Sequence, residues 1–282
     1  MPGTLYLVGT PIGNLGDISQ RALETLGQVD FIAAEDTRVS LKLLNHFGIK
    51  KPLLSYFAHN RRARGEEILQ RLLRGESCAL VTDAGMPAVS DPGEELVALC
   101  AAHGIEVICI PGPSAVVTAL ALSGLPAGRF TFEGFLSTAT KSRRDHLESL
   151  RTEQRAMVFY EAPHKLPYTL RDMLETWGDR RLALCRELTK RYEETIRTTL
   201  AEAAAKYTEE KPRGEFVLVI EGAPPPAPVE SGADLAPALE LLCARTAAGV
   251  SLKDAARQTA EETGLAKNLL YMEALKQRKG QE

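Results

Sequence analysis

The sequence lacks long apolar runs and an excess of positive charge. None of its hydrophobic stretches approaches the roughly 20 residues that a transmembrane helix needs, and its first residues lack the pattern of a secretory signal. We therefore expect a cytoplasmic protein with no membrane partner. With 34 Lys and Arg against 37 Asp and Glu, the formal net charge is −3, which excludes a protein that coats nucleic acid through its total charge.

Metal-binding patterns are also missing. The five cysteines form no CxxC pair, and the five histidines show neither HxH nor HExxH spacing. We therefore expect no dedicated metal site. Cys78, Cys109 and Cys185 lie in strand-like apolar runs, where a buried, reduced thiol is the expected state.

What the sequence does contain is typical of a globular protein of about two domains. The chain has 282 residues, of which 44% are hydrophobic and 25% are charged. Residues 1–124 alternate short apolar runs with amphipathic segments, which predicts an α/β domain with a mostly parallel sheet. The expected strands are 5–8, 31–34, 53–56, 79–82 and 107–110. Ser19 is expected to cap a helix, and Asp91-Pro92 to open another that ends at Gly104.

Residues 125–223 predict a second α/β domain, with fewer strands and longer helices. Its expected strands are 130–136, 157–160, 182–186 and 216–220. The stretch Ala223-Pro224-Pro225-Pro226-Ala227-Pro228 is expected to act as a stiff spacer. Within the tail, 224–282, two helices at 251–260 and 266–277 joined at Gly264 predict a helix-turn-helix-like module. Its apolar face is expected to comprise Leu252, Ala256, Leu265, Leu269, Met272 and Leu275, and the module either packs on the body or contacts RNA.

The first unusual loop follows the first strand. Its sequence, from Gly9 to Asn14, is a Gly-bearing turn, but it fails the GxGxxG template, and GxxxxGK[ST] is absent from the chain. Pro11 has no N–H group, so this turn is a poor cradle for a pyrophosphate.

Two further loops follow the fourth and fifth strands. In the first, Gly85 lets backbone approach a ligand closely, Asp83 can accept hydrogen bonds, and Met86 and Val89 can flank an adenine face. We interpret Asp91 as a helix cap. The second loop, 111–115, sets a rigid turn in which Ser114 can be an N-cap. Because these loops contain little Lys or Arg, they predict a ligand held mainly by backbone contacts rather than a polyphosphate.

Taken together, these segments resemble one protein superfamily. They are Val8-Gly9-Thr10-Pro11-Ile12-Gly13-Asn14, Ala33-Ala34-Glu35-Asp36-Thr37-Arg38, Asp83-Ala84-Gly85 with Asp91-Pro92-Gly93, and Pro111-Gly112-Pro113-Ser114-Ala115, with further matches at 132–136, 159–161, 186–190 and 214–216. On these motifs the chain resembles the tetrapyrrole methylases and, within them, the subgroup of 16S rRNA cytidine 2′-O-methyltransferases. Ser137 and Ala162-Pro163 depart from the expected pattern.

The resemblance implies a fold, a cofactor and a reaction. It implies two α/β domains of the class III S-adenosylmethionine methyltransferase type with a small C-terminal helical module, and S-adenosyl-L-methionine in the cleft between the domains. One side of the cleft would be Pro11, Asp83, Ala84, Gly85, Met86, Val89, Ser114 and Ala115; the other would be Phe159, Tyr160, Arg186, Leu188, Gly214, Glu215 and Phe216. Phe159 and Phe216 can equally belong to the strand core. The implied reaction is 2′-O-methylation of a cytidine in the decoding region of 16S rRNA, on free rRNA or the assembled small subunit, by a homodimer.

That reaction needs a proton acceptor and an RNA-binding surface. A ribose 2′-hydroxyl is a weak nucleophile, so a base must take its proton or a cation must stabilise the alkoxide. The candidates are Glu35, Asp36, Glu187 and Lys190, and the sequence does not choose among them. RNA contacts are expected from Arg38, Arg61, Arg62, Arg64, Lys141, Arg143 and Arg144. The alternative is a solvated helix face for each run, and for Arg38 an ion pair with a nearby acid.

Two other functions compete with this interpretation. A corrin-precursor C-methyltransferase would share the fold, but it has no need of the arginine runs, the Ala-Glu-Asp-Thr-Arg segment or the helical tail. A non-catalytic rRNA-binding assembly factor would have no physical need for three cofactor loops.

Overall fold

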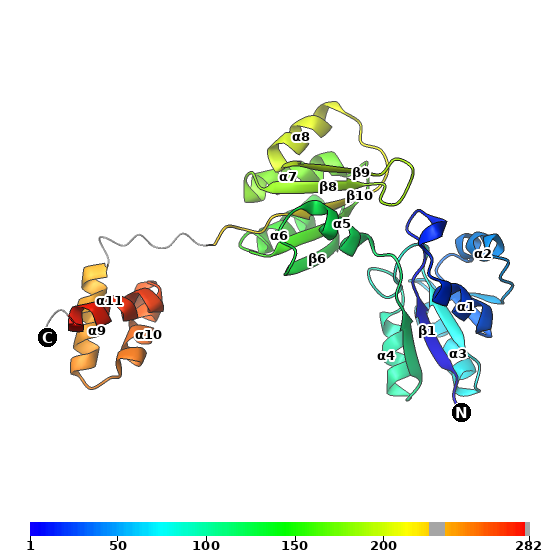
Figure 1. The fold of residues 1–282 in the computed structure, drawn as a ribbon, viewed down its shortest axis with the longest axis horizontal. Helices are drawn as coiled ribbons and strands as arrows, with labels where there is room; N and C mark the ends of the chain where they lie inside the picture. Colours follow the sequence, from blue (N-terminus) through cyan, green and yellow to red (C-terminus); the bar gives the residue numbers. More distant parts are fainter. Residues whose placement is uncertain (226–234, 280–282) are drawn as a thin grey trace. The chain divides into compact units, whose positions relative to one another are not determined.

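The structure, a computed structural model, describes residues 1–225 and 235–279. The chain folds into two compact units, Met1–Ala223 and Pro224–Glu282 (Figure 1). Among the helices that are described, none is long and apolar enough to cross a bilayer.

The first sheet is five-stranded and parallel throughout, in the order β3-β2-β4-β1-β5. Its strands are β1 (Thr4–Val8), β2 (Phe31–Ala34), β3 (Leu53–Ser55), β4 (Cys78–Val81) and β5 (Glu106–Ile110). The central strands β2 and β4 are buried at every position, as expected of near-continuous apolar runs in a sheet covered on both faces. The predicted parallel sheet is confirmed.

Helices cover both faces of this sheet. They are α1 (Gln20–Gln28), α2 (Thr37–His46), α3 (Arg61–Leu73) and α4 (Glu94–Ala102), with a short 3-10 turn, η1 (Leu15–Asp17), before α1. Leu26 of α1 and Leu44 of α2 pack on one face, and Ile68 of α3 and Leu96 of α4 on the other. The predicted cap is confirmed at Ser19, whose hydroxyl accepts the N–H of Ala22.

The second sheet is mixed, in the order β6-β7-β10-β8-β9. Its strands are β6 (Phe130–Phe135), β7 (Ala156–Glu161), β8 (Arg181–Arg186), β9 (Glu194–Thr199) and β10 (Phe216–Ile220). The prediction of fewer strands in this half is wrong, because β9 was missed. It is an edge strand of charged and β-branched residues without an apolar run, so a search for buried strands passes over it.

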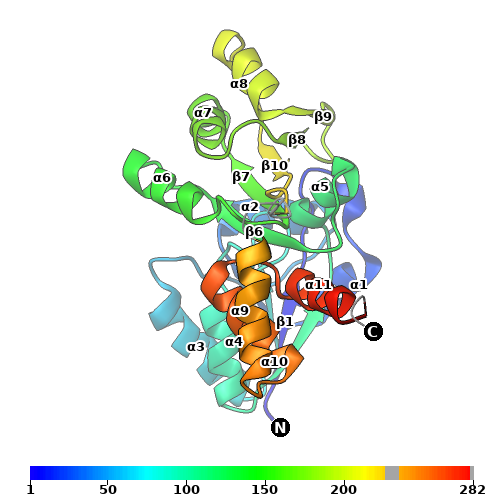
Figure 2. The same cartoon turned by 90° about the vertical axis from the view of Figure 1, so that its left-hand side faces the viewer.

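The helices that pack on the second sheet are α5 (Ala115–Ser123), α6 (Thr140–Ser149), α7 (Leu166–Trp177) and α8 (Leu200–Glu209). Leu147 of α6, Leu170 of α7 and Leu200 of α8 share the core on one face of the sheet. Helix α5 lies on the opposite face of the sheet (Figure 2). Its Leu120 packs there against Val158, Ala183 and Val217. The second half is therefore a three-layer α/β structure in its own right.

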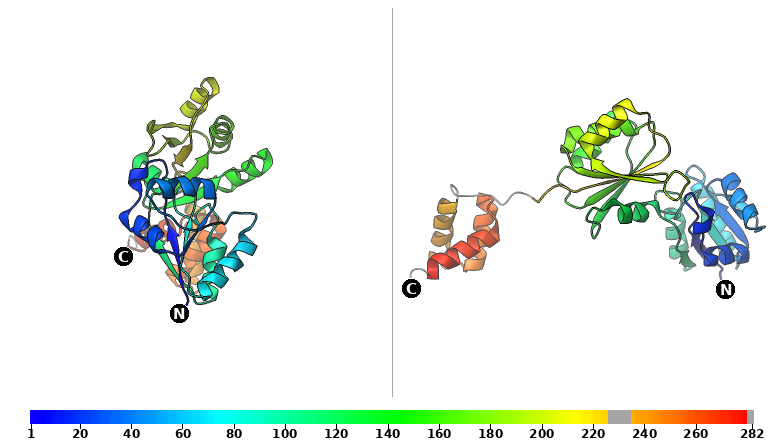
Figure 3. Two further views of the ribbon diagram at one scale, coloured as in Figure 1. Left: turned by 90° about the vertical axis from the view of Figure 1, so that its right-hand side faces the viewer. Right: turned by 45° about the horizontal axis from the view of Figure 1, so that its top comes forward.

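The unit Pro224–Glu282 contains three described helices, α9 (Leu235–Ala247), α10 (Leu252–Thr263) and α11 (Lys267–Lys279) (Figure 3). They share a core that includes Leu242, Ala256 and Leu270. The sequence predicted only the last two helices, joined at Gly264, which indeed ends α10 with a left-handed φ of 72°. Met272 was expected on the apolar face but is exposed. Residues 226–228 of the predicted spacer lie outside the described residues.

The burial of the three strand cysteines depends on where each strand lies in its sheet. Cys78 and Cys185 are buried, as expected. Cys109 is exposed, contrary to expectation, because β5 is an edge strand of its sheet. An apolar run therefore predicts a strand without predicting whether its thiol is covered.

Candidate functional site

The loops that follow β1, β4 and β5 pack directly on one another through their backbones. Thr10 and Gly85 exchange two N–H to carbonyl hydrogen bonds, of 2.9 Å and 3.1 Å. A Cβ placed on Gly9 would lie 2.7 Å from Gly112 Cα and 2.7 Å from Met86 Sδ. The glycine at position 9 is therefore required by the close approach of these loops.

The loop between β8 and β9 reaches across to the first half of the chain. A Cβ on Gly13 would lie 2.5 Å from Lys190 Cγ and 2.9 Å from Thr189 Oγ1. Glu187 and Thr189 adopt the left-handed region, with φ of 52° and 65°, although neither is glycine. Such conformations cost about 1–3 kcal/mol each and persist only where the surroundings impose them.

An ion-pair network holds this loop in place. The Lys190 ammonium lies 3.0 Å from Glu187 Oε1 and 2.8 Å from Glu215 Oε2. Burial lowers the pKa of Lys190, but its hydrogen bonds to Glu215 and Glu187 prevail and raise it above the ordinary value. Burial likewise opposes ionisation of Glu187, yet Lys190 and the Glu215 N–H lower its pKa overall. Both side chains are thus held in their charged forms.

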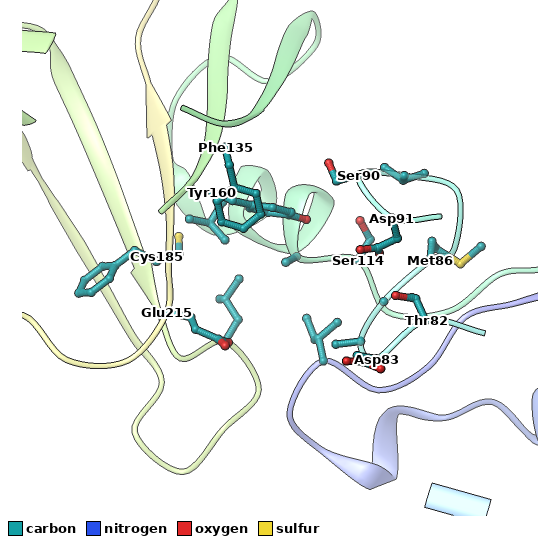
Figure 4. A pocket seen from close by; sticks show the side chains of 18 of the residues that line it. Thr82, Asp83, Met86, Ser90, Asp91, Ser114, Phe135, Tyr160, Cys185 and Glu215 are labelled. Carbon is teal, nitrogen blue, oxygen red and sulfur yellow. The ribbon is translucent and has the colours of Figure 1, made fainter. Parts of the chain in front are cut away.

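Between these two sets of loops lies a cavity of about 400 Å³, in the size range of small-molecule sites (Figure 4). The residues that line it are Ile12, Glu35, Thr82, Asp83, Ala84, Gly85, Met86, Val89, Ser90, Asp91, Ser114, Ala115, Phe135, Tyr160, Glu161, Cys185, Leu188, Lys190, Glu215, Phe216 and Val217. In Figure 4 the labelled side chains form two facing groups. Thr82, Asp83, Met86, Ser90 and Asp91 stand opposite Phe135, Tyr160, Cys185 and Glu215.

The wall contributed by the first sheet is acidic. Glu35 Oε2 accepts the Thr82 hydroxyl at 2.6 Å, and Asp83 Oδ1 accepts the Asp36 N–H at 3.1 Å. Burial and the Glu35 carboxylate raise the pKa of Asp83, and the same two causes raise that of Asp91 to about 6. Across the described residues, no group of three or more His, Cys, Asp or Glu is arranged to hold a metal ion.

The structure corrects the interpretation of Asp91 as a helix cap. Helix α4 begins at Glu94, its N-cap residue is Gly93 with φ of 152°, and no side chain caps it. The preceding turn passes through Ala88 and Ser90, both left-handed with φ of 65° and 66°. This turn leaves Asp91 in the lining of the cavity rather than at the helix end.

The wall contributed by the second sheet includes three aromatic residues, Phe135, Tyr160 and Phe216. The ring of Tyr160 makes edge-on contacts with Phe132 and Phe135, at centroid distances of 5.0 Å and 5.4 Å. The pairing of β6 with β7 shifts register between Phe132 and Gly134, a bulge of the kind that re-aims side chains near functional sites. Phe135 follows this bulge and is 59% exposed while lining the cavity. It offers a flat apolar face at the rim.

Most of the predicted cofactor residues lie in this lining, but four do not. Those in the lining are Asp83, Ala84, Gly85, Met86, Val89, Ser114, Ala115, Tyr160, Leu188, Glu215 and Phe216; those outside it are Pro11, Phe159, Arg186 and Gly214. Phe159 is fully buried, with its ring centroid 6.1 Å from that of Trp177, so the strand-core alternative holds for this side chain. Gly214 has a supporting role, because a Cβ there would lie 2.6 Å from Glu187 Cγ.

Sequence reasoning missed several lining residues. They are Ile12, Thr82, Ser90, Asp91, Phe135, Glu161, Cys185 and Val217. The first four lie in loops that the sequence had already singled out. The others lie at or near strand ends in the second half, and that position was the available signal.

The four candidate proton acceptors are now separated. Glu35 and Lys190 line the cavity, whereas Asp36 and Glu187 do not. Asp36 caps α2 and pairs with Arg38 at 2.6 Å, and hydrogen bonds from Arg38 hold the pKa of Asp36 at about 2. Arg38 thus makes the ion pair that the sequence left as its alternative.

The two predicted RNA-contacting runs differ. On α3, Arg62 is exposed, Arg61 lies 3.2 Å from Glu95, and Arg64 pairs with Glu67. On α6, Lys141 is exposed, but Arg143 is only 4% exposed and lies 2.7 Å from the equally buried Asp172. The burial of Arg143 and its ion pair with Asp172 argue against a contact between this side chain and RNA.

The remaining member of the α6 run is Arg144, which is half exposed. Its guanidinium shares Asp172 with Arg143 and also pairs with Glu175, at 2.8 Å and 2.9 Å. The hydrogen bond to Asp172, together with the negative charges of Asp172 and Glu175, raises the pKa of Arg144.

Comparisons with known proteins identify the families to which this chain is similar. The family model described as Tetrapyrrole (Corrin/Porphyrin) Methylases matches residues 4–204, and the model described as RsmI C-terminal HTH domain matches residues 230–278. The ribosomal RNA small subunit methyltransferase I of Synechocystis sp. is 51% identical over 97% of this chain and 98% of its own. That of Halalkalibacterium halodurans is 47% identical over 95% of this chain and 93% of its own.

Among solved structures, a similar one is uroporphyrin-III C-methyltransferase from Thermus thermophilus, complexed with S-adenyl homocysteine. It is 18% identical, covers 77% of this chain and 97% of its own, and has a TM-score of 0.54, which supports the fold assignment. The family match covers well over half of the chain, and the two curated relatives match nearly all of it. The chain therefore belongs to the tetrapyrrole methylases and, within them, to the ribosomal RNA small subunit methyltransferase I family.

Proposed function

We propose that this protein transfers a methyl group from S-adenosyl-L-methionine to the ribose 2′-oxygen of a cytidine in the decoding region of 16S rRNA. The observation that carries the proposal is near-full-length identity of 51% and 47% to relatives named for small-subunit rRNA methylation. The choice of cytidine and of the 2′-oxygen rests on the motif resemblance, with Gly9-Thr10-Pro11-Ile12-Gly13-Asn14 and Ala33-Ala34-Glu35-Asp36-Thr37-Arg38 as its most specific parts.

The lining of the cavity fits this cofactor. A sulfonium cation is favoured beside Glu35 and Asp83 on the acidic wall, because the cavity is partly desolvated and the negative charges of these two carboxylates lie close together. The small residues Ala84 and Gly85 let the backbone approach a ligand. The opposite wall supplies apolar and aromatic contact for an adenosyl group.

When bound, the cofactor supplies a methyl group made electrophilic by the positive charge on sulfur. The residues of the chain then have to align the acceptor, exclude water and take up a proton. We assign the alignment of the cofactor to the loops after β4 and β5, and closure of the far side to the loop after β8, which Lys190 pins to Glu187 and Glu215.

We assign RNA binding to Arg61, Arg62 and Arg64 on α3, and to Lys141 on α6. These side chains are at least partly exposed, so they can release counterions from phosphates while the rest of the surface stays near neutral. Residues 1–124 would then carry the cofactor loops and this basic surface, residues 125–223 would complete the cleft, and residues 224–282 would give a helical module for RNA. The same resemblance supports a homodimer, which light scattering tests.

The direct test is methyl transfer from labelled cofactor to assembled small subunits and, separately, to free 16S rRNA. We expect label in RNA that survives as an alkali-resistant dinucleotide, the mark of a 2′-O-methyl group, and that maps to one cytidine. Label on a base, or label transferred to a corrin precursor instead, contradicts the proposal. Absence of label with both RNAs, despite measurable cofactor binding by calorimetry, would favour the assembly-factor alternative.

A further inference from the structure

Asp91 lies at a junction that the other carboxylates do not share. Next to the cofactor cavity is a second cavity of about 340 Å³, lined by Ala58, Arg61, Ser90, Asp91, Pro92, Gly93, Glu94 and Glu95. Among the residues that the structure describes, only Ser90 and Asp91 line both cavities. One carboxylate therefore faces the space assigned to the cofactor and also an outer space that contains an arginine.

We propose that Asp91 is the catalytic residue that accepts the proton of the 2′-hydroxyl, with the target nucleotide entering through the outer cavity beside Arg61. This inference rests on the proposed function. In the proposed arrangement, the ribose of the target nucleotide lies at the junction of the two cavities, and the Arg61 guanidinium pairs with a phosphate of the RNA backbone. Arg61 is half exposed and paired only at 3.2 Å with the exposed Glu95, a surface pairing that a phosphate can replace.

The chemical step balances without a further reactant. The 2′-oxygen forms a bond to the methyl carbon as the bond from that carbon to sulfur breaks, and the electron pair of the broken bond stays on sulfur. The hydroxyl proton moves to the Asp91 carboxylate. Asp91 then returns the proton to water through the outer cavity.

The other carboxylates that line the cavity, Glu35, Asp83, Glu161 and Glu215, each accept a hydrogen bond or pair with a cation. Glu35 accepts the Thr82 hydroxyl at 2.6 Å, and Asp83 accepts a backbone N–H at 3.1 Å. Lys190 is a doubly paired ammonium and cannot accept a proton. Thr82 also lies within reach of Asp91, but its hydroxyl proton is directed to Glu35.

The surroundings of Asp91 suit a proton acceptor near neutral pH. Glu35 from the end of β2, Asp83 from the end of β4 and the Tyr160 hydroxyl from β7 face it within the cofactor cavity, and Arg61, Glu94 and Glu95 line the outer cavity. Burial, followed by the Glu35 carboxylate, raises the pKa of Asp91 to about 6. A base with this pKa is largely ionised at neutral pH and still holds a transferred proton better than an ordinary aspartate.

The first test is the variant Asp91→Asn, which keeps the shape of the side chain and removes the base. We expect kcat on rRNA to fall by about 10²–10⁴-fold, while cofactor affinity measured by calorimetry stays within about threefold. The matched control is Glu209→Gln, an exposed carboxylate on α8 outside both cavities, which should leave kcat unchanged.

The second test is the pH profile. Wild-type kcat/KM for rRNA should fall on the acid side with a midpoint near 6, where Asp91 of the free protein becomes protonated. Glu35→Gln removes a negative neighbour of Asp91, so the midpoint should move to lower pH. A midpoint that does not move in this variant contradicts the assignment to Asp91.

The third test needs neither cofactor nor RNA. The pKa of Asp91 in the folded protein is above its ordinary value of 3.8, so folding disfavours the ionised form. The contribution of this group to stability is therefore present at low pH and lost as the pH rises through about 6. Asp91→Asn should raise the Tm of the free protein at pH 8, and the difference should shrink as the pH is lowered toward 4.

The outcomes separate this inference from the proposed function. If the wild type methylates no ribose, the proposed function fails regardless of the variants. If the wild type methylates a 2′-oxygen and Asp91→Asn keeps kcat within about threefold, only the inference fails. Equal loss of cofactor binding and activity would also overturn it, because Asp91 would then serve to bind the cofactor.

Discussion

The two basic runs on α3 and α6 look alike in the sequence and are built for different purposes. Arg61, Arg62 and Arg64 sit on a helix face whose acidic partners are exposed. Arg143, in contrast, is buried against Asp172, which lies 29 residues later on α7, and it donates further hydrogen bonds to the carbonyls of Ser137 and Thr138. One run is available to a ligand, whereas the centre of the other ties two helices together.

The difference shows what local charge density leaves out. A cluster of arginines predicts a phosphate-binding surface only if the arginines are not already paired with carboxylates from another helix or strand. Asp172 accepts hydrogen bonds from both Arg143 and Arg144, so its position decides the role of the whole α6 run. That position depends on how α6 and α7 pack.

The largest effect should come from Arg143→Ala. Removing Arg143 takes away the buried partner of Asp172 and leaves this carboxylate paired only with the half-exposed Arg144, so we expect the free energy of unfolding to fall by up to about 3–5 kcal/mol. Urea denaturation followed by circular dichroism measures this.

A double variant shows whether the loss comes from the stranded charge. Arg143→Met combined with Asp172→Leu replaces the pair by apolar groups and should recover most of the stability. If the double variant is no more stable than Arg143→Ala, the ion pair is not the cause, and the lost contacts with Ser137 and Thr138 carry the effect.

The next largest effect is expected for the combined change of Arg61, Arg62 and Arg64 to Ala. RNA affinity should fall by at least about tenfold, and the slope of log K against log salt should flatten by about 2–3. Cofactor affinity and Tm should stay at wild-type values, because these pairs are exposed. Filter-binding titrations at several salt concentrations measure the slope, and an unchanged slope would show that the α3 run is only a solvated face.

Lys141→Ala should have a smaller effect on the same titration. Loss of one phosphate contact corresponds to a change of about 0.9 in the slope of log K against log salt. The free energy of unfolding should not change. If Lys141→Ala matches the triple variant in its effect, the main RNA contact lies on α6 and the comparison between the two runs is reversed.

The smallest effect is expected for Arg144→Ala. This arginine is half exposed, and its removal leaves Asp172 paired with Arg143. The denaturation midpoint should shift far less than in Arg143→Ala. Equal shifts in the two variants would mean that Asp172 depends on both guanidiniums.

The sequence predicted the first sheet well because parallel strands covered on both faces must be apolar at nearly every position, as Phe31–Ala34 and Cys78–Val81 are. It did not predict β9, an edge strand of charged and β-branched residues without an apolar run. Nor did it predict α9, which begins shortly after the proline-rich stretch and contains Pro237. Proline is compatible with the first turn of a helix, so Pro237 does not prevent this helix from forming.

The sequence predicted which loops line the candidate site but not the positions of several side chains within it. Gly85 and Met86 were recognised because small residues after a strand indicate close approach to a ligand. Asp91 was misread because Asp-Pro commonly precedes a helix, and only the two left-handed residues before it reveal that the chain turns toward the cavity. Phe135 was missed because a strand bulge, which sequence periodicity does not report, sets its direction.

The contact between Gly9, Gly112 and Met86 has a consequence for how this cavity can evolve or be engineered. At Gly9 and Gly112 the two loops meet backbone against backbone, so neither position can gain a side chain without displacing the loops. Substitution at these two positions would therefore disturb the loops rather than adjust ligand preference. The aromatic side, built from Phe135 and Tyr160, is where single substitutions can tune an analogue of the cofactor or a selective inhibitor to this chain.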